Sequence, residues 1–184
     1  MLIEKGSLLI ADPSIVGDPC FHRAVVLITA ISKGSPLGFI LNKPYEVDLD
    51  HILPELSHES FPLFYGGPVD SDQLFFLHKR PDLIEGSIQV HEQIYWGGNI
   101  EQAIDAIDKG ELTPINSRFF LGYSGWEKGQ LAKEFRQKSW LTPSNKVTTG
   151  LFHIPTIDLW KVYLKSFGEK YLIWANSPDN PSYN

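Results

Sequence analysis

The chain has 184 residues, of which 42% are apolar and 21% charged, a composition typical of a soluble globular protein with one core. Its net charge is −6, and its single cysteine, Cys20, excludes an internal disulfide and a zinc site built from cysteines. The longest apolar runs are much shorter than the roughly 20 residues that a membrane-spanning helix needs. The start of the chain lacks the pattern of a secretory signal, so we expect a cytoplasmic protein.

In the first half of the chain the apolar runs are short, rich in β-branched residues and separated by Gly and Pro, which predicts strands. These strands are expected at residues 8–11, 23–31, 37–42, 74–79 and 87–91. The turn at Lys33–Pro36 joins the second strand to the third, so these two are expected to form a hairpin. Residues 48–56 carry apolar side chains at helical spacing and predict a short helix, which Pro54 interrupts.

In the second half helical patterns are more frequent. Asn99 is the expected N-cap of a helix, with Gln102 as its capping-box partner and Gly110 at its end. The buried stripe of this helix is expected to consist of Ile100, Ala103, Ile104 and Ile107. Further helices are expected at 130–138 and 156–167, and strands at 118–123 and 171–175. Hairpins combined with strand–helix alternation predict an α+β fold with a mixed or antiparallel sheet. Residues 177–184 are expected to form a flexible tail.

Acidic residues are concentrated between Pro44 and His78, a segment with seven carboxylates and no Lys or Arg. Binding to nucleic acid needs clustered cations that neutralise phosphates, so direct nucleic-acid binding is disfavoured. A local basic group between Lys128 and Lys138 is interrupted by glutamates, and a solvated helix face explains it better.

The segment around Ser124 has the layout of a nucleophile elbow, because an apolar run ends in a glycine-punctuated turn that precedes a helical pattern. The elbow needs a glycine two residues after the serine, where this chain has Trp126. His153 also precedes Asp158, the reverse of the order in α/β-hydrolases. A structural turn is therefore the favoured interpretation, and a hydrolase or transferase using Ser124 or His78 is the alternative.

Neither a metal site nor a cofactor is expected from the remaining motifs. The six histidines form no His-x-x-x-His pair, and the paired aspartates lack the rest of a calcium loop. The pairs Gly66–Gly67 and Gly97–Gly98 could open anion sites, but left-handed turns explain both.

Arg23 precedes one strand of the expected hairpin and Asn42 ends the other. If the strands pair, the polar residues at these positions approach one another. A structural ion pair between Arg23 and Asp18 is the simpler interpretation, and an arginine that awaits an anionic ligand is the functional one.

Eight segments together point to a family: Leu9–Pro13, Asp18–Val26, Gly38–Pro44, Tyr65–Val69, Leu77–His78, Gly122–Trp126, Gly129–Leu131 and Ser139–Leu141. On these segments, which keep their order over about residues 6 to 142, the chain resembles the AlgH/YqgE family of bacterial proteins. The resemblance implies an α+β fold with a mixed, largely antiparallel, branched sheet, part of it a small barrel, surrounded by helices. It also implies a single domain over residues 1–176.

The resemblance further implies a cytosolic protein with no established enzymatic activity and no agreed catalytic residues. Some members carry the label of transcriptional regulator. The leading hypothesis is therefore a non-enzymatic binding or regulatory protein that presents a surface to a protein or small-molecule partner. The candidate binding residues are Arg23, Asn42, Gly66, Gly67 and Trp126.

Overall fold

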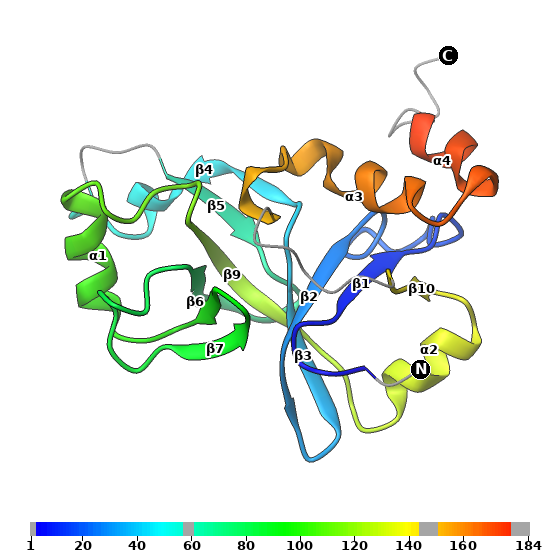
Figure 1. The fold of residues 1–184 in the computed structure, drawn as a ribbon, viewed down its shortest axis with the longest axis horizontal. Helices are drawn as coiled ribbons and strands as arrows, with labels where there is room; N and C mark the ends of the chain where they lie inside the picture. The colour runs from blue at the N-terminus through cyan, green and yellow to red at the C-terminus, as the bar shows by residue number, and fades with distance from the viewer. Residues whose placement is uncertain (1–2, 57–60, 144–150, 178–184) are drawn as a thin grey trace.

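The computed structural model describes residues 3–56, 61–143 and 151–177 (Figure 1). The described strands are β1 (Leu8–Ala11), β2 (Val25–Ser32), β3 (Ser35–Ile40), β4 (Pro44–Asp48), β5 (Pro62–Tyr65), β6 (Val69–His78), β7 (Ile88–His91), β8 (Ile94–Trp96), β9 (Ser117–Gly125) and β10 (Trp140–Leu141). The helices are α1 (Ile100–Asp108), α2 (Gln130–Arg136), α3 (Thr156–Lys165) and α4 (Leu172–Asn176), with 3₁₀ turns at Leu49–His51, Leu151–His153 and Glu169–Tyr171. The expected tail lies, apart from Ser177, outside the described residues.

Strand β9 is the centre of the sheet. It pairs antiparallel with β3 and β6 and parallel with β5, and β5 pairs antiparallel with β4. The sheet is therefore mixed, largely antiparallel and branched, which confirms the expected α+β class. The main path runs β10-β1-β2-β3-β9-β6-β8-β7, and within the described residues its two end strands are not paired with each other. The sheet does not close, so the expected barrel-like part is absent from it.

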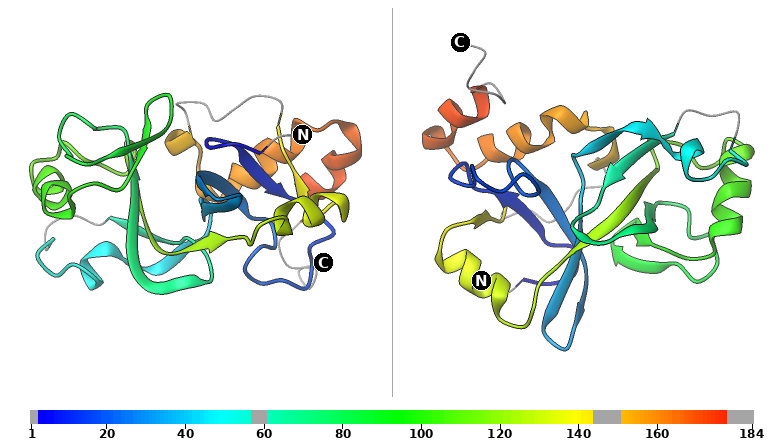
Figure 2. Two further views of the ribbon diagram at one scale, coloured as in Figure 1. Left: turned by 90° about the horizontal axis from the view of Figure 1, so that it is seen from below. Right: turned by 180° about the vertical axis from the view of Figure 1, so that it is seen from behind.

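The helices lie at the periphery of the sheet. Figure 1 shows α1 beside β6 and β7 at one end of the molecule and α2 at the other, while α3 runs along the top from β4 and β5 towards α4. The view from behind in Figure 2 shows the same arrangement. The start of α3 therefore lies close to the strands that follow the β2–β3 hairpin.

The core follows from strand alternation. Successive side chains of a strand point to opposite faces, so Phe119 and Phe120 of β9 enter different apolar clusters. Phe119 packs with the buried face of α1, and Phe120 packs in the cluster that includes Trp160 of α3. The β-branched residues at the start of β2 are buried, because β2 lies between β1 and β3 with apolar clusters on its two faces.

Two of the expected elements require correction. Residues 171–175 form a 3₁₀ turn and α4 instead of a strand, because this short segment packs against α3 through Ala175. The helix expected at 48–56 is limited to the 3₁₀ turn at Leu49–His51, which ends before Pro54.

In α1 the N-cap is confirmed, since Asn99 Oδ1 accepts the N–H groups of Glu101 and Gln102. The capping-box partner is wrong, because the Gln102 side chain accepts the Glu85 N–H. Ala103 and Ile107 are buried as expected, but Ile100 is exposed and Ala106 is buried.

Candidate functional site

The β2–β3 hairpin brings Arg23 and Asn42 together, because the antiparallel register places the start of β2 beside the end of β3. Asn42 Oδ1 accepts the Val25 N–H at 2.8 Å, and Asn42 Nδ2 donates to the Arg23 carbonyl at 2.9 Å. Arg23 has a φ of 54°, in the left-handed region that residues other than glycine rarely adopt. Asn42 therefore holds the strained backbone that directs the Arg23 side chain.

Arg23 and Asn42 line a hollow of about 330 Å³, which we call the cationic hollow. Its described lining residues are His22, Arg23, Asn42, Lys43, Pro44, Thr156, Ile157, Trp160 and Lys161. The Arg23 guanidinium lies 4.9 Å from the centre of the Trp160 ring, and its Nη1 donates to the Ser177 carbonyl at 3.2 Å. Trp160 is held in turn by its own indole N–H, which donates to the Ala11 carbonyl at 2.8 Å.

Lys43 is the second cation of the hollow. Its Nζ donates to the Pro19 carbonyl at 2.6 Å. Burial lowers the pKa of Lys43 from its ordinary value, while the neighbouring Cys20 and Asp18 act in the opposite direction. Asp18 Oδ1 itself accepts the N–H groups of Cys20 and Phe21, so this carboxylate organises the turn before β2.

The N-terminus of α3 opens onto the same hollow through Thr156 and Ile157. The N-cap residue, Pro155, offers no side-chain acceptor to the first N–H groups of the helix. A helix N-terminus carries a partial positive charge and free N–H donors, which favour an anion. Three cationic side chains line the hollow with it, and none of the described lining residues is acidic. This arrangement can hold an anion.

Ser124 is fully buried, and its Oγ donates to the Gly66 carbonyl at 3.1 Å. The same carbonyl accepts the Ile40 N–H at 2.9 Å, so Gly66 links β3 to β9. Within the described residues no histidine is hydrogen-bonded to Ser124. This geometry gives Ser124 a role in joining the strands.

The Gly66–Gly67 pair occupies a point where the backbone passes very close to β9. A Cβ atom at Gly66 would lie 2.1 Å from the Gly122 carbonyl oxygen, and one at Gly67 would lie 2.3 Å from the Tyr123 backbone. Both glycines are buried. The absence of a side chain at both positions therefore allows the backbone of this segment to pass in direct contact with the backbone of β9.

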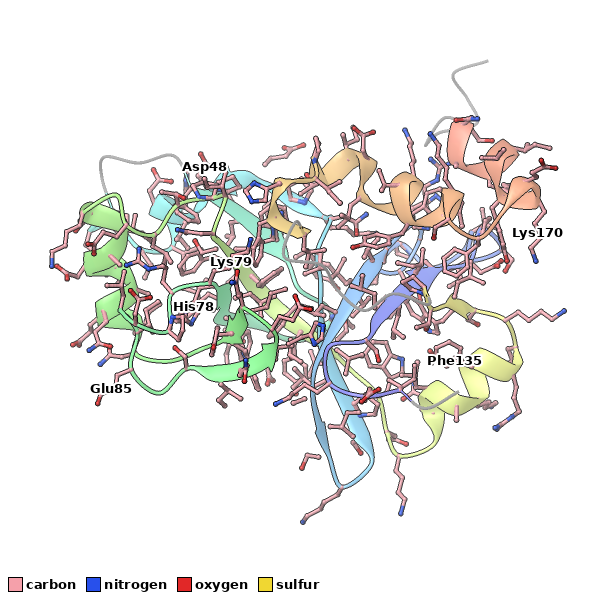
Figure 3. All side chains as sticks on the ribbon, viewed as in Figure 1. Asp48, His78, Lys79, Glu85, Phe135 and Lys170 are labelled. Carbon is pink, nitrogen blue, oxygen red and sulfur yellow. The ribbon has the colours of Figure 1, made fainter. Side chains whose placement is uncertain are left out.

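His78 is fully buried at the end of β6 and is labelled in Figure 3. Its Nδ1 accepts the Arg80 N–H at 3.1 Å, so in the neutral ring Nε2 carries the proton and donates to the Gly97 carbonyl at 3.1 Å. Ser87 Oγ lies 3.1 Å from Nε2 but donates its own hydrogen to the Ile84 carbonyl. Burial lowers the pKa of His78. The ring is thus held neutral with no free lone pair for a general base.

Trp126 is buried, and its indole N–H donates to Glu134 Oε2 at 2.9 Å. The Trp140 indole N–H donates to the same oxygen at 2.7 Å, so Glu134 of α2 connects β9 to β10. Trp126 also lines a separate hollow of about 520 Å³ with Tyr123 and Pro36. The shared turn motifs therefore do not converge on one pocket.

Sequence reasoning missed Trp160 and Lys161 as neighbours of Arg23. They lie on a helix more than a hundred residues away in the sequence, and no local pattern indicates that its start faces the hairpin. Lys43 follows Asn42 directly within the segment Gly38–Pro44, on which the resemblance partly rests, and could have been included on that basis.

Within the described part of the chain, no helix is long and apolar enough to cross a membrane. Nor do three or more His, Cys, Asp or Glu side chains gather there in a group that could hold a metal ion.

Residues 8–172 match the profile of a family described as AlgH-like. A UPF0301 protein of Chlorobium limicola is 36% identical over 99% of this chain and 96% of its own length. A UPF0301 protein of Bacteroides thetaiotaomicron is 35% identical over 100% of this chain and 93% of its own length.

Two solved structures share the fold. The AlgH protein of Pseudomonas aeruginosa superposes with a TM-score of 0.70 at 24% identity, covering 98% of this chain and 100% of its own. A crystallised protein of Corynebacterium diphtheriae has a TM-score of 0.79 at 19% identity, covering 96% of this chain and 94% of its own.

Proposed function

The chain belongs to the AlgH-like family, and we propose that it is a non-enzymatic binding protein whose ligand is a small anion held in the cationic hollow. One observation carries this proposal. Arg23, Lys43 and Lys161 line one hollow together with the N-terminus of α3, in a protein whose net charge is −6. Concentrating cations in one place on an acidic protein favours a specific anionic ligand there.

A phosphate-bearing small molecule fits this set of donors best. An arginine presents a planar fork of N–H groups to a phosphate, lysines add point charges, and a helix N-terminus adds backbone N–H donors. A volume of about 330 Å³ is at the small end of the range for ligand pockets. The expected ligand is therefore compact.

This proposal is tested by titrating the full-length protein with inorganic pyrophosphate at low salt and measuring the heat of binding by calorimetry. We expect saturable binding that Arg23→Gln weakens at least about tenfold, because one charge-assisted contact contributes about 1.5–3 kcal/mol. Arg80→Gln is the matched control, since Arg80 pairs with Asp82 and does not line the cationic hollow. Absence of binding, or equal weakening by both variants, would contradict the proposal.

The regulatory part of the proposal is that the ligand-bound protein engages a partner protein in the cytoplasm. A pull-down with and without pyrophosphate should recover a reproducible partner that depends on Asn42, and cell fractionation tests the location. Direct contact with DNA is disfavoured by the acidic segment, and a gel-shift series at rising salt tests that point.

The alternative of a hydrolase or transferase has less support. Ser124 donates to a backbone carbonyl from a buried position, and both nitrogens of His78 are already hydrogen-bonded. A serine nucleophile needs a base within reach of its hydroxyl, and the described partner of the Ser124 hydroxyl is a backbone carbonyl.

A further inference from the structure

A second hollow adjoins the cationic hollow and shares Pro44 and Thr156 with it. Its volume is about 340 Å³. The walls are mainly apolar and include Phe61, Phe64, Phe152 and Ile154 together with four prolines. It contains Arg118 from β9 and is called the Arg118 hollow below.

Arg118 is a buried cation with only 4% of its surface exposed. Its Nη1 donates to the Leu41 carbonyl at 2.7 Å, and its guanidinium carbon lies 4.8 Å and 5.4 Å from the ring centres of Phe64 and Phe152. Within the described residues no carboxylate lies within 4.0 Å of it. A guanidinium has five N–H donors, so the described residues use only a small part of its hydrogen-bonding capacity.

The charge on Arg118 persists despite its burial. Burial lowers the pKa of Arg118 to about 10, and at neutral pH the side chain is therefore still protonated. Burying a charge costs free energy unless the charge is paired, usually by a carboxylate. The Arg118 guanidinium is instead in contact with the rings of Phe64 and Phe152. Because the donors of a guanidinium lie in its plane, an oxyanion that enters the hollow can bind them while the rings remain stacked.

We infer that the Arg118 hollow binds an aromatic monocarboxylate, with its carboxylate on Arg118 and its ring against the phenylalanine and proline walls. One negative charge is favoured because Arg118 is the one Lys or Arg side chain among the described lining residues. Ser117 Oγ is already committed to the Thr113 carbonyl, so it adds no competing site. Lys79 Nζ lies 5.4 Å from the Phe152 ring centre but does not line the hollow.

This site is separate from the phosphate site proposed above, although the two hollows adjoin. The cationic hollow has one arginine, two lysines and a helix N-terminus, whereas the Arg118 hollow has one arginine, one histidine (His153) and mainly apolar walls. We therefore expect that replacing Arg23 leaves the binding of an aromatic carboxylate unchanged, and that replacing Arg118 leaves the binding of pyrophosphate unchanged.

The test is a titration of the full-length, isotope-labelled protein with sodium benzoate, in which NMR measures the chemical-shift changes. We expect saturable binding with a Kd on the order of 1 mM or tighter, and shifts concentrated on Arg118, Phe152 and Ile154. Benzamide has the same shape without the charge and should bind at least about tenfold more weakly. This comparison uses the unmodified protein, so it does not depend on whether a variant folds.

The variant arm uses Arg118→Lys, which keeps a positive charge and loses the planar fork. We expect it to weaken benzoate binding at least about tenfold, whereas Arg80→Lys, the matched control, leaves it unchanged. Arg23→Gln should also leave benzoate binding unchanged, which separates this result from that of the phosphate site. Equal binding of benzamide, tighter binding of inorganic phosphate in this hollow, or shifts confined to the cationic hollow would each overturn the inference.

Discussion

Gly66 is the residue at which β3, β5 and β9 are joined. Its N–H donates to the Leu121 carbonyl, and its carbonyl accepts from Ile40 and Ser124. These bonds require the backbones to approach so closely that no side chain fits between them. The hydroxyl at 124 then satisfies a buried carbonyl, which explains a serine in an apolar strand without any catalytic role.

Replacing Gly66 by alanine is predicted to cost more than about 3 kcal/mol of the free energy of unfolding, because the new Cβ meets a backbone oxygen that cannot move aside. Gly110→Ala is the control. Gly110 has a φ of 67° but nothing within 4 Å, so its cost is limited to backbone strain of about 1 kcal/mol. Urea unfolding of both variants compares the two costs, and similar losses would argue against the close approach.

The buried ring of His78 predicts a dependence of stability on pH. Its pKa is lowered in the folded state, so the unfolded state binds the proton more readily. The neutral ring therefore contributes full stability above the ordinary histidine pKa of about 6.5, and this contribution is lost as the pH falls below that value. His78→Gln should flatten the decline of stability between about pH 7 and pH 5.

The control for this prediction is His51→Gln, which removes an exposed histidine and leaves the buried surroundings of His78 intact. The measurement is the urea midpoint at a series of pH values. Parallel profiles for wild type and His78→Gln would show that His78 is not the group that titrates.

At the scale of elements, α1 shows how a loop side chain begins a helix. Asn99 Oδ1 accepts two of the N–H groups that have no partner inside the helix. The Gln102 side chain, expected to return to Asn99, instead holds the loop before β7 through the Glu85 N–H. The cap residue could be predicted from sequence, but the partner of Gln102 depends on which loop packs beside the helix.

Asn99→Ala is predicted to lower the free energy of unfolding by about 1 kcal/mol, because these two N–H groups lose their acceptor. Asn99→Asp should retain most of the stability, since a carboxylate accepts the same bonds and suits a helix N-terminus. Thermal unfolding followed by circular dichroism would measure both changes. A similar loss in both variants would mean that the side-chain acceptor at this position is not what stabilises the helix.

At the scale of the whole molecule, β9 unites the two ends of the fold. Its side chains enter the cluster beneath α1 and the cluster beneath α3. A substitution that destabilises one cluster should therefore also destabilise the other. We therefore propose that residues 1–176 form one cooperative domain.

The prediction is a single unfolding transition in urea, with the same midpoint by tryptophan fluorescence and by circular dichroism. Four of the five tryptophans lie on the side of the molecule away from α1: Trp126 and Trp140 belong to the cluster beside β1 and β2, and Trp160 and Trp174 lie on α3 and α4. Asn99→Ala in α1 should shift both signals together. Separate midpoints would indicate two units that unfold independently.

Strands β1, β2, β3, β6, β7 and β9 and helices α1, α2 and α3 followed from local patterns, because apolar periodicity and turn residues act between near neighbours in sequence. The short strands β4, β5, β8 and β10 were not predicted, because each depends on pairing with a neighbouring strand and has too few residues to show a periodicity of its own. The short segment at 171–175 could form either kind of element, and its packing on α3 decided in favour of a helix. The barrel-like part implied by the resemblance is not formed, since strand pairing at the sheet edges depends on the whole topology.

Local sequence patterns were enough to predict the α+β class and the β2–β3 hairpin, and with that hairpin the approach of Arg23 to Asn42, because each depends on contacts between adjacent elements. The position of the start of α3 beside this pair, and the burial of Arg118 against the rings of Phe64 and Phe152, depend on the three-dimensional packing of the chain. Those contacts join residues far apart in the chain, and the burial that defines each hollow comes from all of its walls at once. The candidate sites are therefore formed by tertiary packing, and local sequence patterns could not predict them.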